Sequence, residues 1–208
     1  MTSKSLFTVH CSLFIFFSLT HHSSLRTNML IAQEKRKTNM AEYILYMWQV
    51  EDLIRAHHFN MDLIEENLIS QYAHSERVKN DIRDWYANLM LMMYREGIRE
   101  RGHLSFLKTL VAEMNDFHVR LLNDPHDRRY NELYQMAVVN IDAFRRKLAD
   151  PQTTDIETCM NALYGLLLLR LKKKPVHRET EEAMATFSQM LAVLSKRYLE
   201  AERGEREI

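Results

Sequence analysis

Helix-breaking residues are rare in this chain and widely spaced. The three prolines, Pro125, Pro151 and Pro175, stand about one helix apart, and only four glycines occur among 208 residues. Proline cannot continue a helix interior and glycine often follows a helix end, so the uninterrupted stretches between them favour helices. The sequence predicts an all-α fold: a compact antiparallel bundle or irregular array of about six to seven helices, with no β-sheet.

Apolar residues that recur at three- and four-residue steps locate these helices. We expect them at about residues 41–56, 61–72, 76–101, 104–122, from Pro125 to 148, from 154 to the lysine run at 172–174, and at 179–202. Residues 31–38 could extend the first helix backwards, and Gly102 is expected to end the third. The helix after residue 154 is apolar on every side between Leu163 and Leu169, which predicts a central position.

Besides Ser75, which is expected to cap the helix at residue 76, three helix starts have recognisable capping residues. Asn39 with Glu42, and Thr154 with Glu157, have the spacing in which a cap side chain accepts a hydrogen bond from the first turn. Asp124 followed by Pro125 predicts a third N-cap, with proline in the first turn. These expectations depend only on residues close together in the chain.

Composition excludes some classes of partner. Lys plus Arg equals Asp plus Glu at 28 each, so no net charge steers the protein toward nucleic acid, and no nucleic-acid partner is expected. Cys11 and Cys159 lie in no zinc, redox or disulfide spacing. The residues after position 28 therefore suit a reducing compartment, and a cytoplasmic location is expected.

Residues 1–28 differ in style from the rest of the chain. An apolar run from Leu6 to Leu19 follows Lys4, but it is shorter than a membrane span requires. Three interpretations compete: an upstream stretch translated because the start was assigned too early, a signal peptide that would make the protein exported, and a membrane-proximal tail. We favour the first, with Met29 as the start and residues 29–208 as a single helical domain.

One segment gathers polar side chains in an apolar setting. It predicts a ligand-binding site, and its members are Tyr46, Trp48, Gln49, Glu51, Asp52 and Arg55. Arg55 lies one turn from both carboxylates and can pair with either, and such a group beside aromatic rings could bind a polar small molecule. The competing interpretation, which we favour, is a solvated Glu51–Arg55 ion pair on a helix surface.

The histidines predict no metal site. His57 and His58 precede Asp62 but have no second cluster to complete a zinc site, which needs three or four protein ligands. A di-iron bundle needs two Glu-x-x-His pairs, and only Glu100 with His103 has that spacing. His118 is interpreted as a flanking or satisfied core residue rather than a catalyst. No catalytic residue, metal or cofactor is therefore predicted.

Two stretches of the chain resemble a known family. Residues 29–56, MLIAQEKRKTNMAEYILYMWQVEDLIRA, and the stretch from Tyr164 to Tyr198 are similar to an uncharacterised bacterial family, domain of unknown function 4924, from Bacteroides-type bacteria. The resemblance implies a match over residues 29–208. It implies no activity and no catalytic residues, and it suggests that residues 46–55 are typical of the family.

These observations favour a non-enzymatic helical protein that works through protein contact, as a homodimer. The alternative is a small-ligand-binding protein or enzyme with its pocket near Trp48 and Arg55. A third hypothesis, membrane association, depends wholly on residues 1–28.

Overall fold

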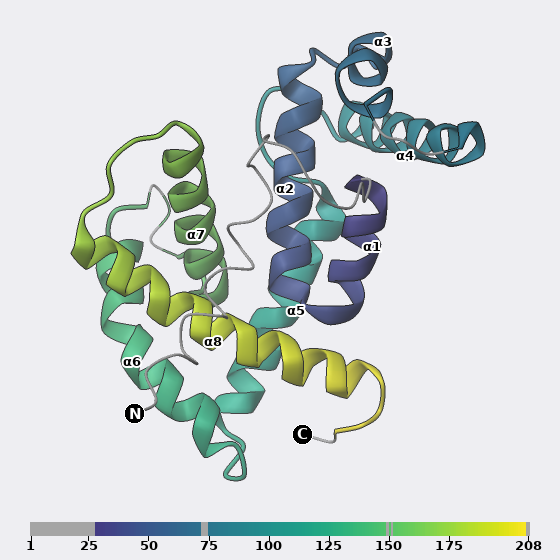
Figure 1. Cartoon of the computed structure of the whole chain (residues 1–208). Helices are drawn as coiled ribbons and strands as arrows, with labels where there is room; N and C mark the ends of the chain where they lie inside the picture. Colours follow the sequence, from purple (N-terminus) through teal and green to yellow (C-terminus); the bar gives the residue numbers. More distant parts are fainter. Residues whose placement is uncertain (1–27, 72–74, 149, 151, 207–208) are drawn as a thin grey trace, which may run out of the picture. The chain divides into compact units, whose positions relative to one another are not determined.

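All regular structure in the described residues is helical. The computed structural model describes residues 28–71, 75–148, 150 and 152–206 (Figure 1). Its eight α-helices are α1 (Asn28–Thr38), α2 (Met40–Ala56), α3 (Met61–Ile64), α4 (Glu76–Arg95), α5 (Ser105–Leu122), α6 (Arg128–Arg145), α7 (Asp155–Leu171) and α8 (Arg178–Glu202). A π-helical segment, Glu65–Ile69, follows α3. The all-α prediction is confirmed, and the expected count is slightly too low.

The extra helix arises at Asn39. This residue has an extended backbone (φ −156°, ψ 104°), which separates α1 from α2, so α1 is not a backward extension of α2. Its side chain accepts a hydrogen bond from the Glu42 backbone N–H at 3.1 Å, and its Nδ2 donates to Glu42 Oε1 at 3.0 Å. The predicted capping pair is confirmed, because these contacts satisfy donors that the first turn leaves unpaired.

Two other helix boundaries differ from the prediction. α4 ends at Arg95, because Gly97 takes a left-handed φ of 69° and Ile98 N–H donates to Met93 O at 3.0 Å. Gly102, which was expected to end this helix, lies in the following connection. The N-cap of α6 is Asp127, whose side chain accepts from Tyr130 N–H, rather than Asp124.

The chain divides into two compact units. The N-terminal unit contains residues 28–116 and 195–206, and the central unit contains residues 117–194. The division falls within α5 and within α8, so each of these helices contributes to both units. Each unit is described separately below, and the prediction about residues 1–28 lies, except for Asn28, outside the described part of the chain.

The N-terminal unit buries one face of each of its longer helices. Its fully buried side chains include Ile44, Ile54, Ile64, Ile82, Tyr86, Met93, Leu104 and Leu107. The buried hydroxyl of Tyr86 accepts from Asn28 Nδ2 at 2.6 Å, and Asn28 Oδ1 accepts from the Tyr46 hydroxyl at 2.7 Å. α8 contributes Ser195, whose Oγ accepts from Ala41 N–H at 3.0 Å inside the unit. Polar bonds thus complete a mainly apolar core.

The central unit is built from the C-terminal turns of α5, with α6, α7 and the first part of α8. Tyr130, Ile141, Ile156, Cys159 and Phe187 are fully buried in it. Cys159 is a buried free thiol. The predicted burial of α7 on every side is wrong at its C-terminal end. There Leu169 is 42 % exposed and Leu171 is 38 % exposed, whereas the first half of α7 is buried on several sides through Ile156, Thr158, Cys159 and Met160.

Candidate functional site

The predicted ligand-binding residues occupy different sides of α2. Trp48, Glu51, Asp52 and Arg55 follow three- and four-residue steps, so their side chains share one side of the helix. Tyr46 lies on the opposite side, where its hydroxyl donates to Asn28 of α1. Gln49 donates to its own helix, at Leu45 O, 3.2 Å away. The structure therefore brings four of the predicted residues together and separates Tyr46 and Gln49 from them.

Glu51 is the most deeply buried charged residue of this group. Its side chain is 0 % exposed, and its two carboxylate oxygens have different partners. Oε2 lies 2.6 Å from His103 Nδ1, whose N–H donates to it, and Oε1 accepts from Leu104 N–H at 2.9 Å. The predicted Glu51–Arg55 surface ion pair is wrong, because the Glu51 carboxylate points into the protein and is occupied by the chain that precedes α5.

Trp48 and His103 complete this contact. Their rings stack with centroids 4.1 Å apart and planes 16° from parallel. Trp48 is 3 % exposed, whereas the side chain of His103 keeps 26 % of its surface exposed. Glu51 and Trp48 together fix the orientation of the His103 ring, one through a hydrogen bond and the other through its flat face.

Arg55 binds the same connection through backbone atoms. Its guanidinium donates to Ile98 O at 3.2 Å and to Gly102 O, and it pairs with Asp52 Oδ1 at 2.7 Å. Of the two pairings expected for Arg55, only the one with Asp52 forms. α2 therefore holds the α4–α5 connection at several points along residues 98–104. We call Trp48, Glu51, Arg55 and His103 the α2 clamp.

Carboxylates also accept from the backbone N–H groups at the start of α5, those of Leu104 and Ser105. Glu51 accepts from Leu104 N–H, and Glu96 Oε2 accepts from both the backbone N–H and the hydroxyl of Ser105, at 2.7 and 2.8 Å. Helix N-termini carry partial positive charge and unpaired donors, so negative groups stabilise them. The α2 clamp consequently supports the start of α5 as well as the connection that precedes it.

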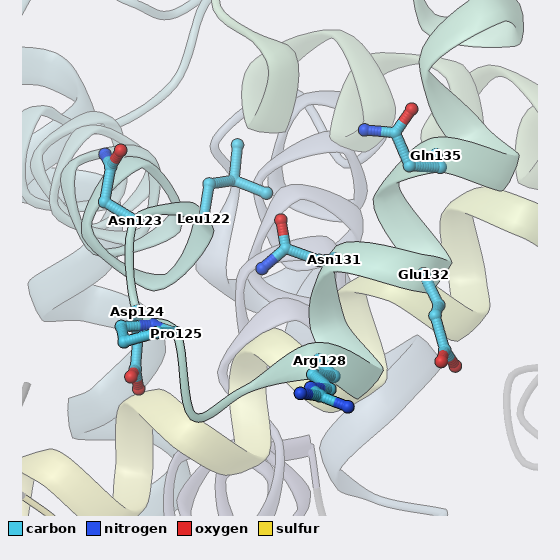
Figure 2. Close-up of a pocket in the computed structure, with 8 residues that line it drawn as sticks. All are labelled: Leu122, Asn123, Asp124, Pro125, Arg128, Asn131, Glu132 and Gln135. Atoms are coloured by element: carbon cyan, nitrogen blue, oxygen red, sulfur yellow. The ribbon is translucent and has the colours of Figure 1, made fainter.

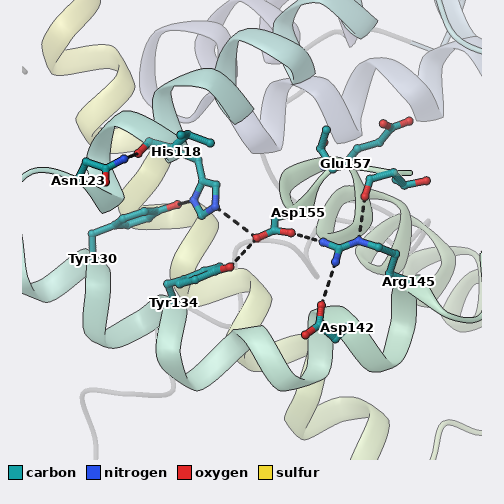
Figure 3. A network of polar contacts seen from close by, with 11 residues as sticks. His118, Asn123, Tyr130, Tyr134, Asp142, Arg145, Asp155 and Glu157 are labelled. Atoms are coloured by element: carbon teal, nitrogen blue, oxygen red, sulfur yellow. Dashed lines mark hydrogen bonds and ion pairs between the residues drawn. The ribbon is translucent and has the colours of Figure 1, made fainter. Parts of the chain in front are cut away.

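A second polar network lies in the central unit and was not predicted from the sequence (Figure 3). His118 is 2 % exposed and lies between Tyr130 and Asp155: its Nδ1 is 2.6 Å from the Tyr130 hydroxyl, and its Nε2 is 3.5 Å from Asp155 Oδ2. The Tyr134 hydroxyl donates to the same Oδ2 at 2.8 Å, and Arg145 pairs with Oδ1. The prediction of a satisfied core histidine is confirmed.

Burial and charge shift the pKa values in this network. The pKa of Asp155 falls from 3.8 to about 2, chiefly because His118 donates to it, with Tyr134 and Arg145 acting in the same direction against burial. Burial, with the bond to Asp155, raises the pKa of Tyr134 to about 12. Burial also raises the pKa of the Cys159 thiol well above its usual range, which leaves that thiol protonated and unreactive.

We expect Asp155 to make stability depend on acid pH. Its folded-state pKa lies below its unfolded value, so the unfolded chain takes up the proton first as pH falls. The stabilisation is fully present above about pH 4 and is lost between about pH 4 and pH 2.

Urea unfolding at several pH values should show a smaller loss of stability over this range for Asp155→Asn than for the wild type. The matched control is Asp116→Asn, an exposed carboxylate that should keep the wild-type pH dependence. Equal pH dependence of all three proteins would contradict the assignment.

A pocket of about 440 Å³ opens in the central unit beside the α5–α6 connection (Figure 2). It contains none of the predicted ligand-binding residues; its lining is Leu122, Asn123, Asp124, Pro125, Arg128, Asn131, Glu132 and Gln135. Most of these side chains are exposed, and none is buried. A specific small-molecule site usually has buried polar groups that orient the ligand, and this lining lacks them.

The described residues contain neither a metal-ligand cluster nor a membrane-spanning helix. No group of three or more His, Cys, Asp or Glu side chains among them is arranged to hold a metal ion. None of the helices in the described part of the chain has both the length and the apolar character that a membrane span requires.

His103 is the site residue that sequence reasoning missed. In the sequence its only notable spacing is the one from Glu100, whereas its partners in the structure are Glu51 and Trp48 on a helix far earlier in the chain. The register of α2 does show that Trp48, Glu51 and Arg55 share a side, but no local pattern indicates what that side contacts. A separation of 52 residues leaves no periodic signal.

In the described residues, the fold and these contacts define an all-helical protein. Its buried polar side chains form hydrogen bonds with the loops that connect its own helices. Residues 29–205 match the family model described as Domain of unknown function (DUF4924), and the chain belongs to this family. The resemblance expected from the sequence is therefore confirmed. No curated protein and no solved structure gave a match.

Proposed function

We propose that this protein works through contact between protein surfaces, as a non-enzymatic helical protein that self-associates. The supporting observation is that several large apolar side chains are exposed in groups on helix faces. Val139 is 72 % and Met136 is 56 % exposed on α6, and Tyr94 is 63 % and Leu91 is 45 % exposed on α4. Single exposed apolar residues are ordinary, but neighbouring ones on one helix are typical of contact surfaces.

The contacts of the α2 clamp support the same proposal. Glu51 and Arg55 bind the backbone of the chain itself, at Leu104 N–H and at the carbonyls of Ile98 and Gly102. Side chains engaged in this way do not also offer those atoms to a ligand. The α2 clamp is thus accounted for by a structural role in holding the fold together. This favours a function through surface contact over a catalytic function.

Sedimentation equilibrium over a wide range of concentrations tests self-association. We expect the average mass to rise above the 24.8 kDa of one chain toward twice that value as concentration increases. A mass that stays at one chain up to the highest soluble concentration would contradict the proposal.

A small-ligand site at the α2 clamp is the second candidate. One observation favours it: His103 is held on Nδ1 by a buried carboxylate while part of its side chain reaches the surface, an arrangement that suits a general base or a ligand contact. A thermal-shift screen of small polar metabolites tests it. A compound that stabilises the wild type but not His103→Ala would support this candidate, and a screen without such a compound would count against it.

We also propose a cytoplasmic location. Its support is Cys159, a buried free thiol in a region without cysteine pairing among the described residues. Fractionation of the native host with an antibody against the protein tests the location, and recovery outside the cytoplasmic fraction would contradict it.

A further inference from the structure

The outward side of α4 carries an ordered set of residues. Asp84, Asn88, Leu91 and Arg95 follow one another at steps of four, three and four, which places them along one side of the helix. All are exposed, with Leu91 at 45 %. The opposite side of α4 is buried in the N-terminal unit through Ile82, Tyr86, Leu89 and Met93. We call the exposed set the α4 seam.

The charges at the two ends of the α4 seam are not used within the described chain. Asp84 and Arg95 form no ion pair with any described residue, although their immediate neighbours are engaged. Arg83 pairs with Glu65 at 2.8 Å, and Glu96 accepts from Ser105. One acidic and one basic side chain therefore flank an exposed leucine, and each is free to meet a charge on another molecule.

A second copy of this chain would offer charges that match those of the α4 seam. When two copies of α4 pack antiparallel about a two-fold axis between Leu89 and Met90, Asp84 and Arg95 are equidistant from that axis. Asp84 of each copy then faces the partner subunit's Arg95, so two opposite-charge pairs form at once. The same operation places Asn88 opposite the partner subunit's Leu91. Parallel packing would instead place like charges together, which is unfavourable.

We propose that the α4 seam binds the α4 seam of a second copy of this chain, antiparallel and two-fold symmetric. This inference rests on the proposed self-association and assigns it a surface. A contact made by one helix from each chain buries less than the roughly 800 Å² per partner of a standard interface. The dimer is consequently concentration-dependent rather than permanent.

A charge-swap experiment tests the α4 seam. Asp84→Arg and Arg95→Asp each convert both symmetric pairs to like charges, and each variant alone should weaken the dimer by about 100-fold or more. An equimolar mixture of the two variants restores opposite charges at both ends of the seam. Sedimentation equilibrium of the mixture should therefore recover the dimer, with an affinity close to that of the wild type.

The controls separate this inference from the proposal it rests on. Asp116→Arg makes the same change at an exposed position on α5, and it should leave the dimer unchanged. Circular dichroism should show that all variants fold, because Asp84 and Arg95 are exposed. If the wild type dimerises and both single variants dimerise equally well, the α4 seam is not the contact surface, although self-association itself is supported. A wild type that never exceeds one chain in mass would overturn both.

Discussion

Replacing Glu51 with leucine is expected to lower the free energy of unfolding by about 3 kcal/mol. The substitution leaves the buried Leu104 N–H without its acceptor and removes the carboxylate that orients His103. Glu51 is 0 % exposed, so water cannot replace the missing oxygen at its position. Urea unfolding followed by circular dichroism measures the change.

The matched control is Glu100→Leu, a substitution of the same kind at an exposed residue in the α4–α5 connection. It should change stability by less than about 0.5 kcal/mol. A similarly small effect of Glu51→Leu would mean that this carboxylate is not needed for folding. That result would favour the ligand-site interpretation of the α2 clamp over the structural one.

Phe187→Ala is expected to destabilise the protein by about 3–5 kcal/mol, through lost burial and the cavity that remains. Phe187 lies on α8 and is 0 % exposed in the core of the central unit. Chemical unfolding again provides the measurement. Val139→Ala in the same unit is the control: Val139 is 72 % exposed, so its truncation should cost less than about 0.5 kcal/mol. Equal losses for the two variants would contradict the burial assigned to α8.

Local signals predicted the helices well wherever the deciding contacts are local. Asn39 caps α2 and Thr154 caps α7, because each side chain bonds to a residue only three positions away. The two wrongly predicted helix boundaries, at the end of α4 and the start of α6, also depend on residues close together in the chain. Gly97 and Gly102 were both candidates for the residue that ends α4, and Asp124 and Asp127 were both candidates for the N-cap of α6. Local sequence alone did not distinguish these neighbouring candidates.

The candidate site shows the opposite situation. Glu51 and Arg55 lie one helical turn apart, and a sequence pattern predicts their pairing because it reveals only contacts between residues close together in the chain. In the structure a carboxylate in the core must have donors, and those donors are His103 and Leu104 from a distant connection. Burial thus decided the partner of Glu51, and burial depends on how helices pack.

The sequence by itself determined the all-α class, most helix positions and two of the caps, because these follow from periodicity and from residues within one helical turn of each other. The family was indicated separately, by the resemblance of two longer stretches of the chain. Only the tertiary structure decided that α2 clamps the α4–α5 connection and that His118 joins Tyr130 to Asp155. The physical reason is that a polar group buried in the low-dielectric interior must find a hydrogen-bond partner among the groups buried beside it. Those neighbours come from helices far apart in the chain, so the sequence of one helix does not identify them.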